Sequence, residues 1–72
     1  MKNQLQGKII KIFNTNSGLI MGEDGNQYNF FIDDLLNKIE LKINLLVLFK
    51  PQLYVIKNTN IYKAILISTI KD

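Results

Sequence analysis

The 72-residue chain contains no cysteine, histidine, tryptophan or arginine, and it has a single proline. Without cysteine, neither disulfides nor thiolate metal sites supplement its small core, so packing alone must hold the fold. Histidine and cysteine are also the side chains that most often serve as general base and strong nucleophile. Their absence argues against an enzyme.

Acidic side chains give no sign of a metal or cofactor site. The adjacent acid pairs are Glu23-Asp24 and Asp33-Asp34, and neither lies in a spacing that resembles a calcium loop with ligands at alternate positions. Turn formation explains Asp24 and helix capping explains Asp33. We therefore expect no cofactor and no bound metal.

Long apolar runs are missing as well. The longest, Leu45 to Phe49, has five residues, whereas a membrane helix needs about 20. Polar residues near the start, and Lys11 within the first apolar run, leave no room for a signal-peptide hydrophobic region. The sequence predicts a soluble, cytoplasmic protein without a membrane partner, folded as one domain over residues 1–72.

The net charge of +3 comes from nine lysines against six acids. This excess favours polyanions mildly. Lysine gives a phosphate a point charge but lacks the bidentate fork with which arginine binds guanine edges, so nucleic-acid binding would be led by the backbone and weakly sequence-specific. An AT-rich genome is the alternative explanation for a composition rich in Lys, Ile and Asn.

The first half of the chain has the pattern of a β-meander. Residues 7–13 alternate as a half-buried strand, with Ile10 and Ile12 on one face and Ile9, Lys11 and Phe13 on the other. Turn-forming residues at 14–18 and a hairpin at Asp24-Gly25 separate this strand from apolar stretches at 19–21 and 28–32.

The second half predicts a short helical segment and two further strands. Asp33 and Asp34 can cap a helical segment over 35–40. A strand begins at Leu45 and is expected to end near Pro51, because proline lacks the N–H that interior pairing needs. A loop over residues 57–60 then leads into a last strand from about 61 to 70.

These five strands suit an all-β, five-stranded Greek-key barrel with a short helical turn between strands 3 and 4. Residues 7–14, GKIIKIFN, look like the opening strand of a cold-shock domain, and residues 14–18 fill that domain's first turn. Asp24-Gly25 falls at its second hairpin. Residues 41–49 resemble the approach to its fourth strand, with Asn44 in place of a glycine, and residues 64–67 resemble its closing strand.

The resemblance implies an oligonucleotide-binding (OB) type barrel that binds single-stranded RNA or DNA. Cold-shock domains stack bases on a strand-one tryptophan and on aromatic motifs in strands two and three. Here the second strand offers GLIM at 18–21 and the third offers YNFFI at 28–32. Because each stacked base contributes about 1–3 kcal/mol, the missing rings predict low affinity. Small translation initiation factors and ribosomal S1-type repeats resemble the same barrel pattern and also imply RNA.

Phe13 and Phe31 are the rings we expect to stack on bases. If Asn29 faces solvent, strand alternation exposes Phe31 and buries Tyr28 and Phe30. Phe13 shares a face with Lys11 in the predicted strand, although a bulge could turn its ring into the core.

Four lysines and two asparagines complete the predicted site. Lys8, Lys11, Lys57 and Lys63 would form a phosphate track, unless they are simply solvated. Asn14 and Asn16 could bind bases, unless they serve the backbone of their own turn.

The same fold could instead serve as a protein-interaction module. Consecutive apolar residues at 45–49 and 65–67 send side chains to both faces of a strand, so a homodimer or another protein partner could cover Leu46, Leu48 and Leu66. Alternatively, residues 53–56 could lie in a loop that folds back over the barrel.

Overall fold

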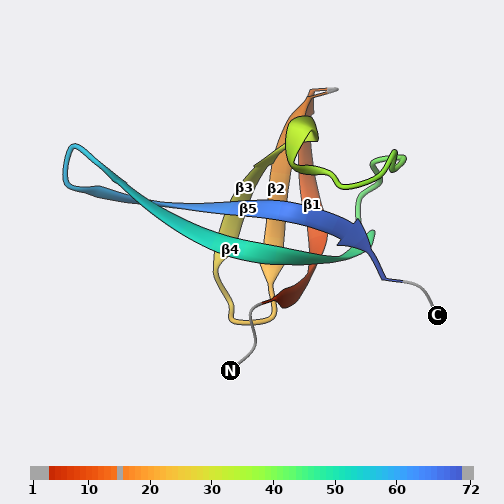
Figure 1. Cartoon of the computed structure of the whole chain (residues 1–72), viewed down its shortest axis with the longest axis horizontal. Helices are drawn as coiled ribbons and strands as arrows, with labels where there is room; N and C mark the ends of the chain where they lie inside the picture. The colour runs from red at the N-terminus through yellow and green to blue at the C-terminus, as the bar shows by residue number, and fades with distance from the viewer. Residues whose placement is uncertain (1–3, 15, 71–72) are drawn as a thin grey trace.

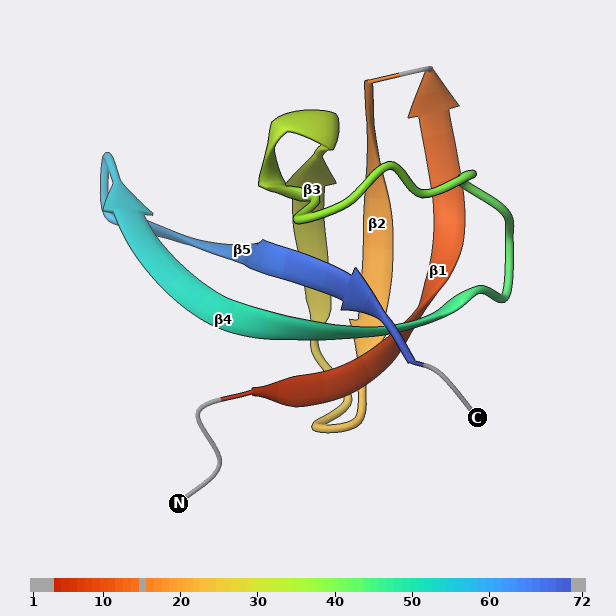
Figure 2. The same cartoon turned by 45° about the vertical axis from the view of Figure 1, so that its right-hand side comes forward.

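Five strands close into a barrel in this computed structural model, which describes residues 4–14 and 16–70. The order around the barrel is β1-β2-β3-β5-β4, and a 3-10 turn, η1 (Ile32–Asp34), follows β3 (Figures 1 and 2). The strands are β1 (Leu5–Asn14), β2 (Ser17–Gly22), β3 (Gln27–Phe31), β4 (Leu46–Ile56) and β5 (Thr59–Thr69). The expected five-stranded OB-type barrel with a helical turn between strands 3 and 4 is confirmed.

The pairing explains how the barrel closes. β1, β2 and β3 form an antiparallel meander, and β4 and β5 form a long hairpin. β4 pairs with β1 antiparallel over Leu46 to Phe49, while β5 meets β3 in parallel at Asn29 and Lys63. In the closed part of the barrel, each strand therefore presents one face to the interior and one to the outside.

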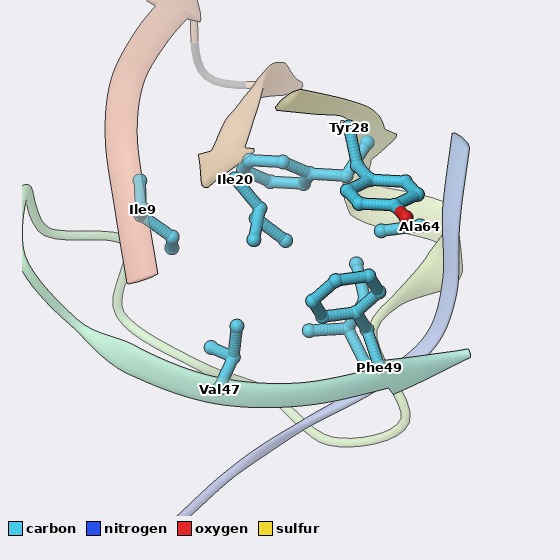
Figure 3. Close-up of a cluster of buried hydrophobic side chains, with 8 residues drawn as sticks. Ile9, Ile20, Tyr28, Val47, Phe49 and Ala64 are labelled. Atoms are coloured by element: carbon cyan, nitrogen blue, oxygen red, sulfur yellow. The ribbon is translucent and has the colours of Figure 1, made fainter. Parts of the chain in front are cut away.

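The core consists of small and aliphatic side chains packed around three rings (Figure 3). Tyr28 and Phe30 are buried from β3, as alternation predicts, and the Tyr28 ring lies 4.9 Å from that of Phe49 between centroids. All five strands contribute, and the fully buried members besides Tyr28 are Ile9, Ile20, Phe30, Val47, Phe49, Ala64 and Ile67.

The predicted faces of β1 were wrong at Ile9. Ile9 pairs with Ile20 and Lys11 pairs with Leu19, so Ile10 is left without a partner as a β-bulge. The bulge shifts the alternation by one residue. Ile9 therefore lies in the core while Lys11 and Phe13 face solvent.

The helical segment expected over 35–40 is not helical. The helical turn comes earlier, at η1, and Asp34 lies inside it, where its carboxylate accepts a hydrogen bond from the N–H of Phe31 at 3.2 Å. An irregular connection leads on to β4, and Asn44 adopts the left-handed conformation (φ 72°), which confirms its glycine-like role. Within the described residues, no helix has the length and apolarity needed to cross a bilayer.

The prediction that β4 ends near Pro51 was also wrong, since β4 runs on to Ile56. The pairing between β1 and β4 ends at Phe49, so Pro51 lies where β5 is the neighbouring strand of β4, and proline is tolerated at such an edge. Lys57 and Asn58, both with positive φ, form the two-residue turn into β5. Residues 53–56 are exposed in this hairpin and do not fold back over the barrel.

The turn from β2 to β3 is held by a small hydrogen-bond network around Asp24. Gly25 has φ 86°, as the predicted hairpin requires. The Tyr28 hydroxyl donates to Asp24 Oδ2 at 2.5 Å, and the backbone N–H of Asn26 donates to Oδ1 at 3.1 Å. Desolvation alone would raise the pKa of Asp24, but these hydrogen bonds outweigh it and lower the pKa below its ordinary value of 3.8.

This network predicts a pH-dependent effect of Tyr28→Phe. A carboxylate whose pKa is lowered by folding stabilises the fold above its unfolded pKa, and that contribution disappears as pH falls through the folded pKa. At neutral pH we expect the variant to lose about 1 kcal/mol of unfolding free energy. Urea unfolding should show the difference from the wild type shrinking below pH 4, whereas Tyr62→Phe should show no such trend. A constant difference down to about pH 2 would contradict this role for Asp24.

Candidate nucleic-acid interface

The outward-facing residues of β1, β2 and β3, together with Lys63 of β5, form one continuous surface, here called the outer wall. The strand register arranges it in rows that run across the sheet. One row is Lys8, Met21 and Gln27; the next is Lys11, Leu19, Asn29 and Lys63; the last is Asn14, Ser17 and Phe31, with Phe13 bulged beside Asn14.

Both predicted rings are exposed on the outer wall. Phe13 is 54% exposed and Phe31 is 51% exposed. Phe13 lies unpaired at a second register shift, between Ile12 and Asn14, so the bulge leaves its ring outside rather than turning it into the core. β2 separates the two rings, and two strand spacings amount to about 10 Å.

Lys63 is tied to the ring of Phe31 and to an acid. Its Nζ lies 5.3 Å from the ring centroid, in cation–π range, and 3.4 Å from Asp34 Oδ2. The same Asp34 oxygen accepts the N–H of Phe31. A ring, a cation and an anion therefore meet at this corner of the outer wall, and Asp34 offsets part of the positive charge beside the ring.

The side chain of Asn14 serves the backbone of the first turn. Its Oδ1 accepts a hydrogen bond from the N–H of Asn16 at 2.6 Å, which is the turn role that asparagine commonly fills. The main-chain carbonyl of Asn16 accepts a hydrogen bond from the N–H of Ile32. Thr15, which belongs to the predicted turn, lies outside the described residues.

Three of the four predicted lysines lie together. Lys8 and Lys11 are exposed on the outer wall, and Lys63 is at its β5 margin. Lys57 is in the turn at the tip of the β4–β5 hairpin, which extends well beyond the barrel (Figure 1). The structure therefore does not bring Lys57 to the other predicted residues.

Sequence reasoning missed the centre of the outer wall. Leu19 and Met21 are half-buried there, and Ser17 lies between the two ring-bearing strands. The alternation of glycine and isoleucine at 18, 20 and 22, all buried, is the pattern that could have placed 17, 19 and 21 outside. The middle of the surface is aliphatic rather than aromatic.

A shallow apolar depression borders the end of the outer wall that carries the rings. It is lined by residues from the end of β1, from η1 and from the connection before β4, namely Ile12, Asn14, Ile32, Ile39 and Leu41. Among the described residues, no group of three or more acids, histidines or cysteines could hold a metal ion. The surface therefore offers rings, aliphatic side chains and ammonium groups to a ligand.

Comparisons with protein-family models, with curated proteins and with solved structures find no match to this chain. The resemblance to cold-shock domains therefore stays a prediction that depends on short sequence motifs.

The close approach of β1 and β2 beneath the outer wall can be tested at Gly18. A Cβ there would clash with the Lys11 carbonyl oxygen and would meet the Phe30 ring at 2.8 Å. We expect Gly18→Ala to cost about 2–3 kcal/mol in urea unfolding, because backbone and a core ring must both shift. Gly25→Ala is the control: its Cβ meets no atom within 4 Å, so it should cost only about 1–2 kcal/mol for its left-handed conformation. An equal or smaller loss for Gly18→Ala would contradict the close approach.

Proposed function

We propose that the chain binds single-stranded RNA or DNA on the outer wall, weakly and with little dependence on sequence. The observation that carries this proposal is the exposure of Phe13 and Phe31 on one face of one sheet. The same face carries Lys8, Lys11 and Lys63. Rings supply stacking surfaces that every base can use, and ammonium groups attract phosphates.

The two rings suit an unstacked strand. Successive bases in a stack are about 3.4 Å apart, whereas β1 and β3 are separated by about 10 Å. Neighbouring stacked bases therefore cannot lie on Phe13 and Phe31 at once. A flexible single strand can splay its bases to reach both rings and cross Leu19 between them, whereas a duplex cannot do so without unpairing.

The same surface explains why affinity and discrimination should be low. Lysine offers no bidentate fork, and the polar side chains on the wall that face outward from β3 are the amides of Gln27 and Asn29. Asn29 already donates to the Tyr62 carbonyl at 3.4 Å. Two stacked bases contribute about 2–6 kcal/mol together, and salt-sensitive phosphate contacts supply the rest of the binding free energy.

A second candidate is a protein interface on the outside of β4 and β5. Leu46 and Leu66 are exposed there and Leu48 is half-buried. Leu66 also has φ 50°, an unusual conformation for leucine, at the bulge where β5 passes Phe49. If a second copy or another protein buries these three side chains, Leu46→Lys should abolish the association. Light scattering would detect the loss of a homodimer, and a pull-down the loss of another protein.

Titration of fluorescent oligonucleotides tests the first proposal. We expect saturable binding of poly-pyrimidine and mixed single strands at about 50 mM salt, with log K falling by about 0.7 per log unit of salt for each phosphate contact. Phe31→Ala should weaken binding by roughly tenfold, since it removes about 1–3 kcal/mol of stacking. Lys11→Ala should lower affinity and also reduce the salt slope.

Matched controls exist on the connection before β4. Ile43 is as exposed as Phe31, at 51%, and Lys42 is an exposed lysine outside the outer wall. Ile43→Ala and Lys42→Ala should leave binding nearly unchanged. Absence of saturable binding at 50 mM salt would refute the nucleic-acid proposal, and equal losses in all four variants would refute the assigned surface.

We expect Asp34→Asn to raise the affinity for single-stranded nucleic acid. Removing the carboxylate that pairs with Lys63 leaves the ammonium beside Phe31 available to a phosphate. Asparagine keeps an oxygen that can accept the N–H of Phe31. We expect affinity for a single strand to rise about threefold to tenfold at low salt. Asp33→Asn makes the same change in net charge one residue away and should raise affinity less; an equal gain would show that net charge alone is responsible.

A further inference from the structure

The outer part of the β4–β5 hairpin, residues 52–63, is here called the arm, and it projects from the barrel as a two-stranded ribbon (Figures 1 and 2). Residues that pair across the ribbon share a face. Leu53 pairs with Tyr62 and Val55 with Asn60, and this inner face continues directly from Pro51 and its partner Ala64, which is fully buried in the core.

Beyond the barrel, no other part of the described structure covers the inner face of the arm. Ala64 is 0% exposed, yet further along the same face Leu53 is 52% and Val55 is 64% exposed. Tyr62 stands at the base, edge-on to the core ring of Tyr28 with centroids 5.6 Å apart. A surface that is core-like in composition but open to water gains free energy when another apolar surface covers it.

The arm carries positive charge and no acid. Its charged residues are Lys57 and Lys63, whereas five of the six acids of the chain lie between residues 23 and 40. Lys57 is at the tip of the arm. Glu23 and Asp24 are in the turn next to its base, where Asp24 accepts the hydroxyl of Tyr28. Each copy of the chain thus carries a basic tip and an acidic base on one side of an apolar face.

We propose that the arm associates with the arm of a second copy of this chain. In a two-fold arrangement the two inner faces lie against each other, antiparallel, so that Leu53 and Val55 of each copy pack on the same face of the other. Lys57 of one copy then lies over the arm base of its partner, close to Glu23 and Asp24. A two-fold axis makes every such contact twice.

The dimensions agree with this pairing. From Pro51, at the base of the arm, to Ile56, before the turn, β4 has six residues, which span about 20 Å at the rise of a strand. Antiparallel overlap of two such arms carries each tip to the other's base. Because Asp24 has two oxygens with about four acceptor positions, it can take a lysine while it keeps Tyr28.

The contact area makes this a weak dimer. A standard interface buries about 800 Å² on each partner, and one face of the arm offers less than that. We therefore expect a concentration-dependent equilibrium with Kd on the order of 100 µM. The inference is independent of nucleic-acid binding, because no residue of the inner face lies on the outer wall.

Sedimentation velocity from about 10 µM to 1 mM tests the proposal. The wild type should shift from monomer to dimer. Val55→Lys, which places a charge in the middle of the inner face, should weaken association more than tenfold. Ile43→Lys, an equivalent change at an exposed position outside the arm, should leave association as in the wild type. Circular dichroism melting checks that each variant is folded.

A charge exchange identifies the partner surface. In a dimer of two Lys57→Glu chains, the new glutamate would face Glu23 and Asp24 of the other copy. In a dimer of two Glu23→Lys chains, the new lysine would face Lys57 of the other copy. Like charges therefore meet in both cases, and each variant alone should be mainly monomeric. Mixed in equal amounts, the two variants present a favourable contact at both ends of the pair and should restore association. Glu23 also accepts the N–H of Gln6 at 2.8 Å, so recovery in the mixture separates a lost contact from a disturbed turn.

Three results would overturn the proposal. The first is a wild type that stays monomeric at 1 mM, which would leave the arm to another kind of partner. The second is a dimer that Leu46→Lys disrupts and Val55→Lys does not, since that places the contact on the outside of β4. The third is failure of the charge-exchanged mixture to associate when both variants are folded.

Discussion

In β1, the side chain of Ile9 points into the barrel and that of Lys11, two residues later, points out of it. Regular alternation forbids this arrangement, and the bulge at Ile10 makes it compatible with continuous pairing to β2. Without the extra residue, Lys11 and Phe13 would follow Ile9 into the core, where an unpaired ammonium is costly. One register shift therefore gives the barrel its core and the outer wall its ring and its lysine.

Glycine lets core side chains approach the backbone of the outer wall closely. Gly18 faces inward beneath Ser17 and Leu19, and its missing side chain lets the Phe30 ring lie against β2 from inside. Phe30 is buried and Phe31, the next residue, is exposed beside Lys63. Core packing and the presentation of a ring to solvent are thus two consequences of one strand, which fixes the position of Phe31 more firmly than a loop would.

Sequence alone was sufficient where a single residue type decides the conformation. Alternation separated Phe31 from Tyr28 and Phe30, Gly25 marked its hairpin, and Asn44 was identified as a glycine substitute. It failed where tertiary pairing decides. The bulge at Ile10 depends on the register with β2. The course of β4 past Pro51 depends on where β1 stops pairing with it.

The surface site was predictable in part for the same reason. Strand parity alone identified Phe31 as an outward-facing ring. Lys8 and Lys11 differ in parity and reach the same face only through the bulge at Ile10, so parity could not place them together. Lys57 could not be separated from them, because the length of the arm follows from the unexpected extent of β4. The ion pair between Lys63 and Asp34 joins residues 29 positions apart and depends on the parallel contact of β3 and β5.

The distribution of charge and apolar surface gives the two exposed regions different physical properties. On the outer wall, rings and lysines surround half-buried aliphatic residues, so a flexible polyanion can use every group present. On the arm, exposed apolar side chains lie on both faces, with Leu53 and Val55 on the inner face and Tyr54 and Ile56 on the other, and the charged residues of the arm are Lys57 at the tip and Lys63 at the base. A phosphate chain would contribute little binding free energy on such a surface. Burial of Leu53 and Val55 is favourable only when an apolar surface replaces the water around them. A barrel of this size can therefore keep ligand binding and self-association on separate surfaces, since β4 and β5 extend together beyond the part of the barrel that pairs with β1 and β3.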